Sequence, residues 1–315
     1  MVSPSESLIK GRDSSEFRFD SAKYKHLLPD LDKKATSIDV FFMNGVFCVV
    51  SKSRRSELTE KADNKKVEFD THITRKWETS DGSTVVIQGP LLGLDDAFLV
   101  GTLISLYFEK NGTRGEYYCN YTDIGRKLGY RIPLGGKPKK NIQKSLSRLD
   151  ECKIKIYDRK GYLFWNNSII VDLEPEGKGK GFKLKISLNS KIATYIEKQQ
   201  FSRAEFKKMK YLTGEWDKAF YFLLESSKSD MVETTIDDVY EIFRERGTNA
   251  KNDDSSLPIE FDQSAYRRLP SRKRYTVWDD MSRNILKMKD KALISTESYI
   301  AKNGDIKLVR SAPLP

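Results

Sequence analysis

The sequence contains few of the residues that build metal centres and disulfide frameworks. Its 315 residues include three cysteines, Cys48, Cys119 and Cys152, and two histidines, His26 and His72. The odd number and wide spacing of the cysteines match neither a disulfide framework nor a zinc-ligand pattern. We therefore expect ordinary buried thiols in a reducing compartment, and no metal site.

Phosphate-binding loops and catalytic sets are also missing. The pattern G-x-x-x-x-G-K-[ST] does not occur, and GPLLGLDD, 89–96, lacks the lysine that would reach a phosphate. The two histidines lie far apart, in segments of uncertain order, and offer no candidate for a paired-histidine nickase site or a Ser-His-Asp set. The aspartate pairs at 95–96, 237–238 and 279–280 fall near predicted helix starts or on a solvated helix face, where the helix dipole accounts for them. We expect no enzyme, no catalytic residue and no cofactor.

No segment has the length and apolarity of a membrane span or a signal peptide. The longest apolar run, FLVGTLISLYF at 98–108, is interrupted by small polar residues. The first residues, MVSPSESLIKGRDSSEF, contain no apolar stretch of signal-peptide length. The sequence therefore predicts a soluble, cytoplasmic protein that does not contact a membrane.

Positive charge is present in excess, and it is concentrated in two places. The chain has 56 basic and 45 acidic residues, a formal net charge of +11. Residues 137–160 carry nine basic and three acidic side chains, and residues 264–291 also carry nine and three. Since these two excesses together exceed the net charge of the whole chain, the remainder is close to neutral. Two such surfaces indicate a polyanionic partner.

The first basic segment, KPKKNIQKSLSRLDECKIKIYDRKG at 137–161, changes its apolar period halfway. Ile142, Leu146 and Leu149 are spaced as one face of a helix. The alternation of CKIKIY at 152–157 predicts a strand, followed by a turn at 158–161. A basic helix followed by a basic hairpin is typical of a recognition helix and its wing.

The elements around this segment predict a winged helix-turn-helix. A helix at 94–110 with an acidic first turn precedes a short helix at 122–129, which Thr122 is expected to cap. The basic helix and two strands, at 152–157 and 161–172, follow. PEGKGKG, 175–181, is interpreted as a joint between domains because glycine and charge are concentrated there.

The same order recurs after the proposed joint. A strand at 182–189 and a helix at 190–199 lead to helices at 215–227, 234–247 and 274–295, and to a closing hairpin over Asn303-Gly304. The predicted fold class is α+β, with two tandem winged helix-turn-helix domains and a partly disordered N-terminal region. The expected divisions are a flexible region with a β-hairpin over Asn44-Gly45 at 1–70, domain 1 at 71–174 and domain 2 at 182–315. A second hairpin is expected across Asp81-Gly82.

The predicted DNA-contacting residues lie on the two basic helices and their hairpins. Arg148 and Arg283 are the expected guanine readers, because a guanidinium fork can bond O6 and N7 together. The other basic residues are expected mainly to contact phosphate. The full set is Lys137, Lys139, Lys140, Lys144, Ser147, Arg148, Arg159, Lys160, Arg272, Lys273, Arg274, Thr276, Arg283, Lys287 and Lys302.

Six segments of the chain resemble iteron-binding plasmid replication initiators, the tandem winged-helix family of TrfA-like and RepE-like proteins. They are IQGPLLGLDDAFLVGTLISL, TDIGRKLGY, NIQKSLSRLDECKIKI, KLKISLN, FYFLLESS and DIKLVR, and the resemblance spans about residues 85–310. The pattern LGY followed by SLSRL is its most specific part. The polar insertion at 248–263 and the N-terminal hairpin region have no match.

The resemblance implies a bacterial, DNA-associated protein that binds direct repeats at a plasmid origin. It also implies opening of the duplex, contacts with host initiator and helicase proteins, and a switch between monomer and homodimer. A winged-helix transcriptional regulator is the alternative, in which one domain reads DNA and the other senses a signal or dimerises. Basic recognition helices in both halves favour the initiator, since a regulator is expected to keep one of them neutral.

Overall fold

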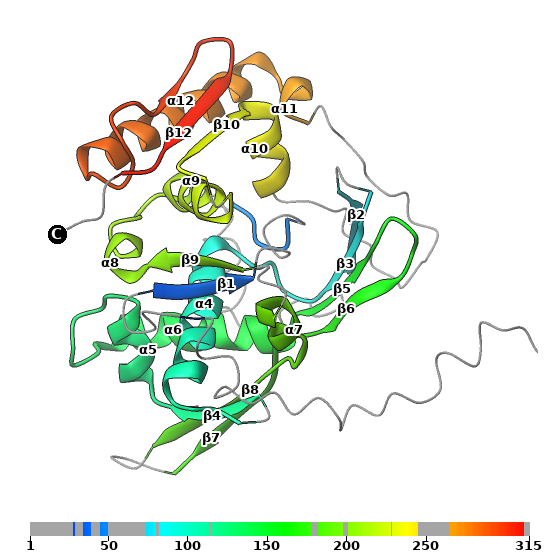
Figure 1. Ribbon diagram of the computed structural model, residues 1–315, viewed down its shortest axis with the longest axis vertical. Coiled ribbons are helices and arrows are strands. Elements are labelled where there is room, and N and C mark those ends of the chain that lie inside the picture. The colour runs from blue at the N-terminus through cyan, green and yellow to red at the C-terminus, as the bar shows by residue number, and fades with distance from the viewer. Residues whose placement is uncertain are drawn as a thin grey trace, which may run out of the picture.

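The computed structural model describes residues 28, 34–38, 45–49, 74–79, 82–113, 115–177, 182–197, 201–227, 229–244 and 265–311 (Figure 1). In this part of the chain, helices pack around small sheets whose strands all pair antiparallel. The fold is therefore a mixture of α and β structure, as the sequence predicted. Most of its helices and strands belong to two units with the same order of elements.

The first unit begins with a helix that is buried along almost its whole length. Its elements are α4 (Leu94–Glu109), β4 (Glu116–Cys119), α5 (Tyr121–Lys127), α6 (Gly136–Glu151), β7 (Ile170–Glu176) and β8 (Lys183–Leu188). The three strands form a sheet in the order β4-β8-β7. The helix expected at 122–129 is present, but Asn120 caps it rather than Thr122, because the Asn120 side chain accepts from the Asp123 amide.

The second unit repeats this order. Its elements are α9 (Glu215–Ser226), β10 (Met231–Thr235), α10 (Ile236–Phe243), α12 (Ser271–Asp290), β11 (Tyr299–Ile300) and β12 (Asp305–Val309). Its sheet has the order β10-β12-β11, so in both units the last strand lies between the strand after the first helix and its own hairpin partner. The hairpin over Asn303-Gly304 is present, with Gly304 at a φ of 96° that favours glycine.

A third sheet corrects the sequence interpretation of the first hairpin. It contains β2 (Thr74–Glu78), β3 (Thr84–Gln88), β5 (Lys153–Tyr157) and β6 (Leu163–Asn167), in the order β2-β3-β5-β6. The pairing of β2 with β3 confirms the hairpin expected across Asp81-Gly82. The hairpin that follows α6, however, joins this sheet and not the β4-β8-β7 sheet. The predicted strand at 161–172 is in fact β6 and the start of β7, which belong to different sheets.

The glycine-rich segment at 175–181 is not a joint between domains. The strands before and after it pair with each other, with Glu176 opposite Lys183, so the segment connects two strands of one sheet. Glycine and charge are as typical of a hairpin connection as of a linker, and composition alone does not distinguish them. A boundary between 174 and 182 would therefore separate β7 from β8. The division of the chain into two domains stays a prediction.

Part of the predicted flexible N-terminal region is a strand. β1 (Lys34–Ile38) pairs with β9 (Phe201–Glu205) along its full length, and the Ser105 hydroxyl of α4 donates to the Lys34 carbonyl. The hairpin expected over Asn44-Gly45 falls partly on residues outside the described part, and Cys48 forms a bridge to Gly93. The insertion at 248–263 also lies outside the described residues. The remaining elements are α7 (Lys191–Glu197), α8 (Phe206–Met209) and α11 (Ala265–Arg268).

The two units contact each other through their first helices. The rings of Phe98 on α4 and Phe222 on α9 lie 4.8 Å apart between centroids. The Lys218 ammonium on α9 lies 2.5 Å from Asp95 Oδ1 on α4 and 2.9 Å from Glu215 Oε1. Burial lowers the pKa of Lys218, but the two carboxylates outweigh it and raise the pKa above its ordinary value. Apolar packing and a buried ammonium therefore join the two units.

Candidate nucleic-acid interface

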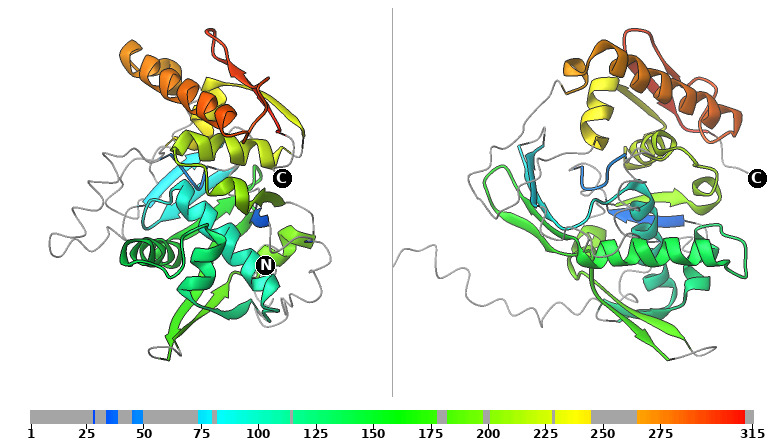
Figure 2. Two further views of the ribbon diagram at one scale, coloured as in Figure 1. Left: turned by 90° about the vertical axis from the view of Figure 1, so that its left-hand side faces the viewer. Right: turned by 180° about the vertical axis from the view of Figure 1, so that it is seen from behind.

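The third helices of the two units, α6 and α12, lie on the same side of the molecule. Figure 2 shows both helices facing the viewer in its right-hand view; in its left-hand view α6 lies at the left edge and α12 runs obliquely from the upper left towards the middle. These helices contain most of the predicted DNA-contacting residues. One extended ligand along this side would meet both of them.

α6 separates apolar and basic side chains as its spacing predicted. Ile142, Leu146 and Leu149 are buried against the first unit. The exposed side presents four lysines at the first three turns: Lys137, Lys139, Lys140 and Lys144. No acidic residue lies in the first turn, so the partial positive charge of the helix N-terminus adds to that of the lysines. This end of α6 is suited to anions.

Arg148 has a different environment from the one that the sequence predicted. Its guanidinium Nη2 lies 2.6 Å from Asp96 Oδ1 and its Nε 3.1 Å from Asp96 Oδ2, which is a two-point ion pair across to α4. The Arg148 side chain is 26% exposed, and that of Asp96 is 1% exposed. Arg148 is therefore held against α4 by Asp96, and its role as a guanine reader stays a prediction.

The buried Asp96 carboxylate explains why Arg148 is held there. Asp96 is the third residue of α4, and it accepts from the backbone amide of Gly93 at 2.8 Å and from the hydroxyl of Ser145 on α6. A buried carboxylate requires such partners, because the cost of removing it from water is several kcal/mol. In the sequence SLSRL, the first serine and the arginine thus fasten α6 to the start of α4. Ser147, the other serine, is exposed and donates to Glu151.

α12 presents a basic and partly aromatic surface. Met281, Ile285 and Met288 are buried, whereas the predicted contact residues Arg272, Lys273, Thr276, Arg283 and Lys287 are exposed. Arg283 is 58% exposed, and its Nη2 lies 2.8 Å from Asp279 Oδ2 and 2.7 Å from Asp280 Oδ1 on the same helix. Pairs of this kind at a helix surface are weak, so Arg283 can exchange these partners for a ligand. Arg274 is half-buried and donates to Ser271.

The predicted contact residues outside the helices lie at two hairpin turns. Lys302 is exposed between β11 and β12, and the indole of Trp278 on α12 donates to the neighbouring Ala301 carbonyl at 3.3 Å. Arg159 and Lys160 are exposed at the turn between β5 and β6. The first of these hairpins therefore belongs to the second unit, and the other belongs to the four-stranded sheet.

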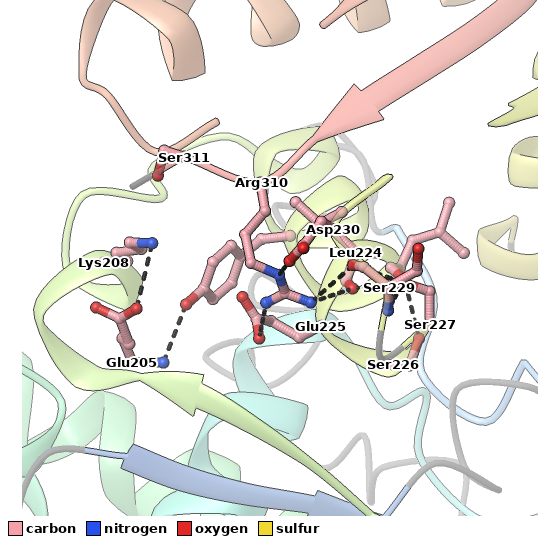
Figure 3. Close-up of polar contacts among 12 residues, drawn as sticks. Glu205, Lys208, Leu224, Glu225, Ser226, Ser227, Ser229, Asp230, Arg310 and Ser311 are labelled. Carbon is pink, nitrogen blue, oxygen red and sulfur yellow. Dashed lines mark hydrogen bonds and ion pairs between the residues drawn. The ribbon is translucent and has the colours of Figure 1, made fainter. Parts of the chain in front are cut away.

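Arg310 connects the end of the β11-β12 hairpin to α9 (Figure 3). Its Nη1 donates to Glu225 Oε2 at 2.6 Å, and its Nη2 donates to the carbonyls of Leu224 and Ser229, each at 3.1 Å. Burial raises the pKa of Glu225, and Arg310 offsets only part of this rise. Since Arg310 directly follows β12, this cluster fixes the hairpin relative to the first helix of its unit.

Several exposed side chains near these helices were missed by the sequence reasoning. Asn141 and Gln143 are exposed on α6, and amides of this kind can bond adenine in a major groove. Tyr275 on α12 is 66% exposed and stacks on Trp278, with ring centroids 6.2 Å apart. A helical wheel centred on charge overlooks these residues, although their outward positions on the wheel could have revealed them.

The cysteine thiols are packed in the interior. Cys48, Cys119 and Cys152 are all buried, and none of them forms a disulfide with another described residue. Burial raises the pKa of Cys119 and of Cys152 to about 12, so both stay protonated at neutral pH. Among the described residues there is no group of three His, Cys, Asp or Glu side chains placed to hold a metal ion. No helix in the described part is long and apolar enough to cross a membrane.

No protein-family model matches the sequence, and a search of curated proteins finds no relative. Solved structures similar to this chain include two of domains 2 and 3 of RctB, with TM-scores of 0.49 and 0.46 and identities of 10% and 9%. They cover 78% and 76% of this chain, and 94% and 91% of their own. A third is the Pi initiator protein in complex with iteron DNA, with a TM-score of 0.46 and 11% identity, which covers 90% of this chain and 98% of its own. An iteron-binding initiator is thus among the structures that this chain resembles.

Proposed function

We propose that the protein is a sequence-specific, double-stranded DNA-binding replication initiator of a plasmid. The observation that carries this proposal is the repeated arrangement of two units, each with a basic third helix, on one side of the molecule (Figure 2). We interpret the units as tandem winged helix-turn-helix domains. α6 and α12 are their recognition helices, and the hairpins β7-β8 and β11-β12 are their wings.

The distribution of exposed charge supports DNA as the ligand. α6 presents lysines over its first three turns, and α12 presents arginine and lysine along most of its length. Lysine and arginine that neutralise phosphates release counterions, which gives strong and salt-dependent affinity. The partly free Arg283 and the exposed Thr276 supply groups for base edges in the major groove.

Two unlike recognition helices in one chain favour direct repeats as the target. A protein that binds as a symmetric dimer reads a palindrome, because the symmetry of the DNA matches that of the protein. α6 and α12 differ in sequence, so a single chain reads two different half-sites and a non-palindromic site. Repeats of such a site in one orientation are the arrangement found in an iteron array.

A winged-helix regulator is the alternative that the sequence left open. In that function one third helix would sense or dimerise, and its exposed side would not need to be basic. The exposed sides of both α6 and α12 are basic, which favours the initiator. Opening of the origin, contacts with host initiator and helicase proteins, a homodimeric state and a location in the bacterial cytoplasm belong to the proposal. It includes no cofactor, metal or catalytic step.

The experiment is binding of the full chain to direct repeats taken from the DNA next to its gene. The basic residues of the two helices and their hairpins are enough for about 6–10 phosphate contacts, which would reduce affinity by about 10³–10⁵ between about 50 and 200 mM salt. A single repeat in which one half-site has been reversed is the control for the non-palindromic site. A log-log salt slope shallower than about −3, or equal affinity for the natural and the altered repeat, would contradict the proposal.

A further inference from the structure

The outer face of the β2-β3-β5-β6 sheet is basic, although it belongs to neither winged helix. Its inner face is mostly apolar, with Trp77, Val85, Ile154 and Trp165 buried there together with one cation, Arg75. The side chains that alternate with these lie on the other face. Strand register places Lys76, Val86, Lys155 and Asn166 in one row across all four strands.

Positive charge dominates this outer face and the turn at its end. The basic residues are Lys76, Lys153, Lys155, Arg159 and Lys160. None of these five side chains forms an ion pair or a side-chain hydrogen bond with another residue that the structure describes. The acidic residues are Glu78 and Asp158, and the Asp158 carboxylate accepts from the backbone amides of Lys160 and Tyr162. Of the two carboxylates, the one in the β5-β6 turn is therefore already hydrogen-bonded, and Glu78 at the end of β2 is the other.

β5 of this sheet follows α6 directly in the chain, with one buried residue between them. Glu151 is the last residue of that helix, Cys152 is buried, and Lys153 is the first residue of β5. Figure 2 shows the β5-β6 hairpin leaving the C-terminal end of α6 on the side that carries α6 and α12. A duplex placed against α6 therefore passes this face where it leaves the end of the helix.

The spacing of the lysines matches a phosphate backbone. Lys153 and Lys155 are two residues apart on one strand face, a separation of about 7 Å. Successive phosphates of one DNA strand advance by about 3.4 Å along the axis, so this separation spans about two nucleotides. Tyr162 at the turn is 69% exposed, and its phenol can bond a phosphate oxygen.

We propose that this sheet face binds the phosphate backbone of duplex DNA that flanks the sequence read by α6. This proposal rests on the proposed function and adds to it a third contact surface that reads no bases. It predicts that the protein covers more DNA than its two recognition helices reach. It also predicts that affinity depends on the length of the duplex beyond the repeat.

The test compares two duplexes, one that ends at the edge of the repeat and one extended by about ten base pairs, or one helical turn, on each side. The full chain is compared with Lys153→Gln/Lys155→Gln and with the matched control Lys153→Arg/Lys155→Arg. These outward side chains are exposed, so thermal unfolding of both variants should match that of the unmodified protein.

We expect the unmodified protein and the arginine control to bind the extended duplex about tenfold more tightly than the short one. Two phosphate contacts at about threefold each account for that factor. The glutamine variant should lose this gain, and its salt slope should be shallower by about 2, while its base preference and its affinity for the short duplex stay unchanged.

Several results would overturn the proposal. One is a glutamine variant that keeps the gain on the extended duplex, or that loses affinity equally on both duplexes. Another is an effect confined to single-stranded DNA, or a change in oligomeric state measured by sedimentation. Failure of the proposed function has a different signature, because the unmodified protein would then bind neither duplex in preference to unrelated DNA.

Discussion

Each unit has an aspartate as the third residue of its first helix, and the two aspartates have different hydrogen-bond partners. Asp96 on α4 accepts from the Gly93 amide, from Ser145 and from Arg148, the last two on the third helix of its unit. Asp217 on α9 accepts from the Gly214 amide in the same way. Its other carboxylate oxygen, however, is buried and has no hydrogen-bond partner among the described residues.

This difference means that the third helix of the first unit is ion-paired to the first helix, whereas the third helix of the second unit lacks this ion pair in the described part of the chain. In the first unit, Arg148 of α6 forms an ion pair with the buried Asp96 carboxylate of α4. In the second, Arg283 of α12 is exposed, and among the described residues its ion pairs are with two carboxylates of its own helix. The position opposite Asp217 is taken by Asn284, whose Oδ1 would clash with a Cβ on Gly214. An arginine on a third helix therefore does not identify a base reader until its partners are known.

The largest expected effect concerns where the first unit ends. β8 and α7 contribute five buried aliphatic side chains, Leu184, Ile186, Leu188, Ile192 and Ile196. Burial of this set is worth about 10 kcal/mol, which is comparable to the stability of a whole domain. A fragment ending at Leu173 should therefore show no cooperative thermal transition, whereas one ending at Met209 should. A cooperative transition in the shorter fragment would restore the boundary that the sequence suggested.

The next effect tests the lock between α6 and α4. Arg148→Ala leaves the buried Asp96 carboxylate without its charged partner, so it should reduce the free energy of unfolding by about 3–5 kcal/mol. Chemical denaturation measures this loss, and Arg148→Lys should recover only part of it, because an ammonium cannot replace the two-point fork. If Arg148→Ala instead unfolds like the unmodified protein and relaxes a base preference, then Arg148 reads DNA.

Arg283→Ala supplies the other half of the comparison. Because its ion pairs are exposed, we expect a change in unfolding free energy of about 0.5 kcal/mol or less. Base discrimination at one position of the repeat should fall by about 1–3 kcal/mol, as measured by binding-site selection. Asp280→Asn, which removes one competing carboxylate, is the control and should keep the preference. Unchanged selection by Arg283→Ala would remove it from the reading surface.

The sequence predicted periodic elements well and long-range pairing poorly. The buried stripe of α6 follows from helical spacing, which is a local property, and it was predicted correctly. The partners of strands are not local: β5 follows α6 in the chain but pairs with β3, which precedes α4. The hairpin that follows α6 was therefore assigned to the wrong sheet. The pairing of β7 with β8 across a glycine-rich segment was missed for the same reason.

The candidate site shows the same limit at the level of single residues. Lysines spaced along one helix face could be placed on the exposed side, since exposure follows from the wheel. The Arg148 ion pair spans 52 residues of sequence and depends on how α6 crosses α4. No pattern within the helix shows that crossing. The two aspartates of LDD were correctly given to the start of a helix, but the partner of the second was not predictable.

The smallest expected effect separates phosphate contacts from base contacts on α6. Lys144 is exposed and forms no ion pair with a described residue, so Lys144→Gln should remove one phosphate contact without a structural change. Loss of one contact makes the log-log salt slope shallower by about 0.9 and weakens all sequences by about threefold. Fluorescence anisotropy over a salt series measures both quantities. If the weakening instead depends on the base opposite Lys144, then this lysine contacts a base edge. The first unit would then contribute to sequence specificity although its Arg148 is held against α4.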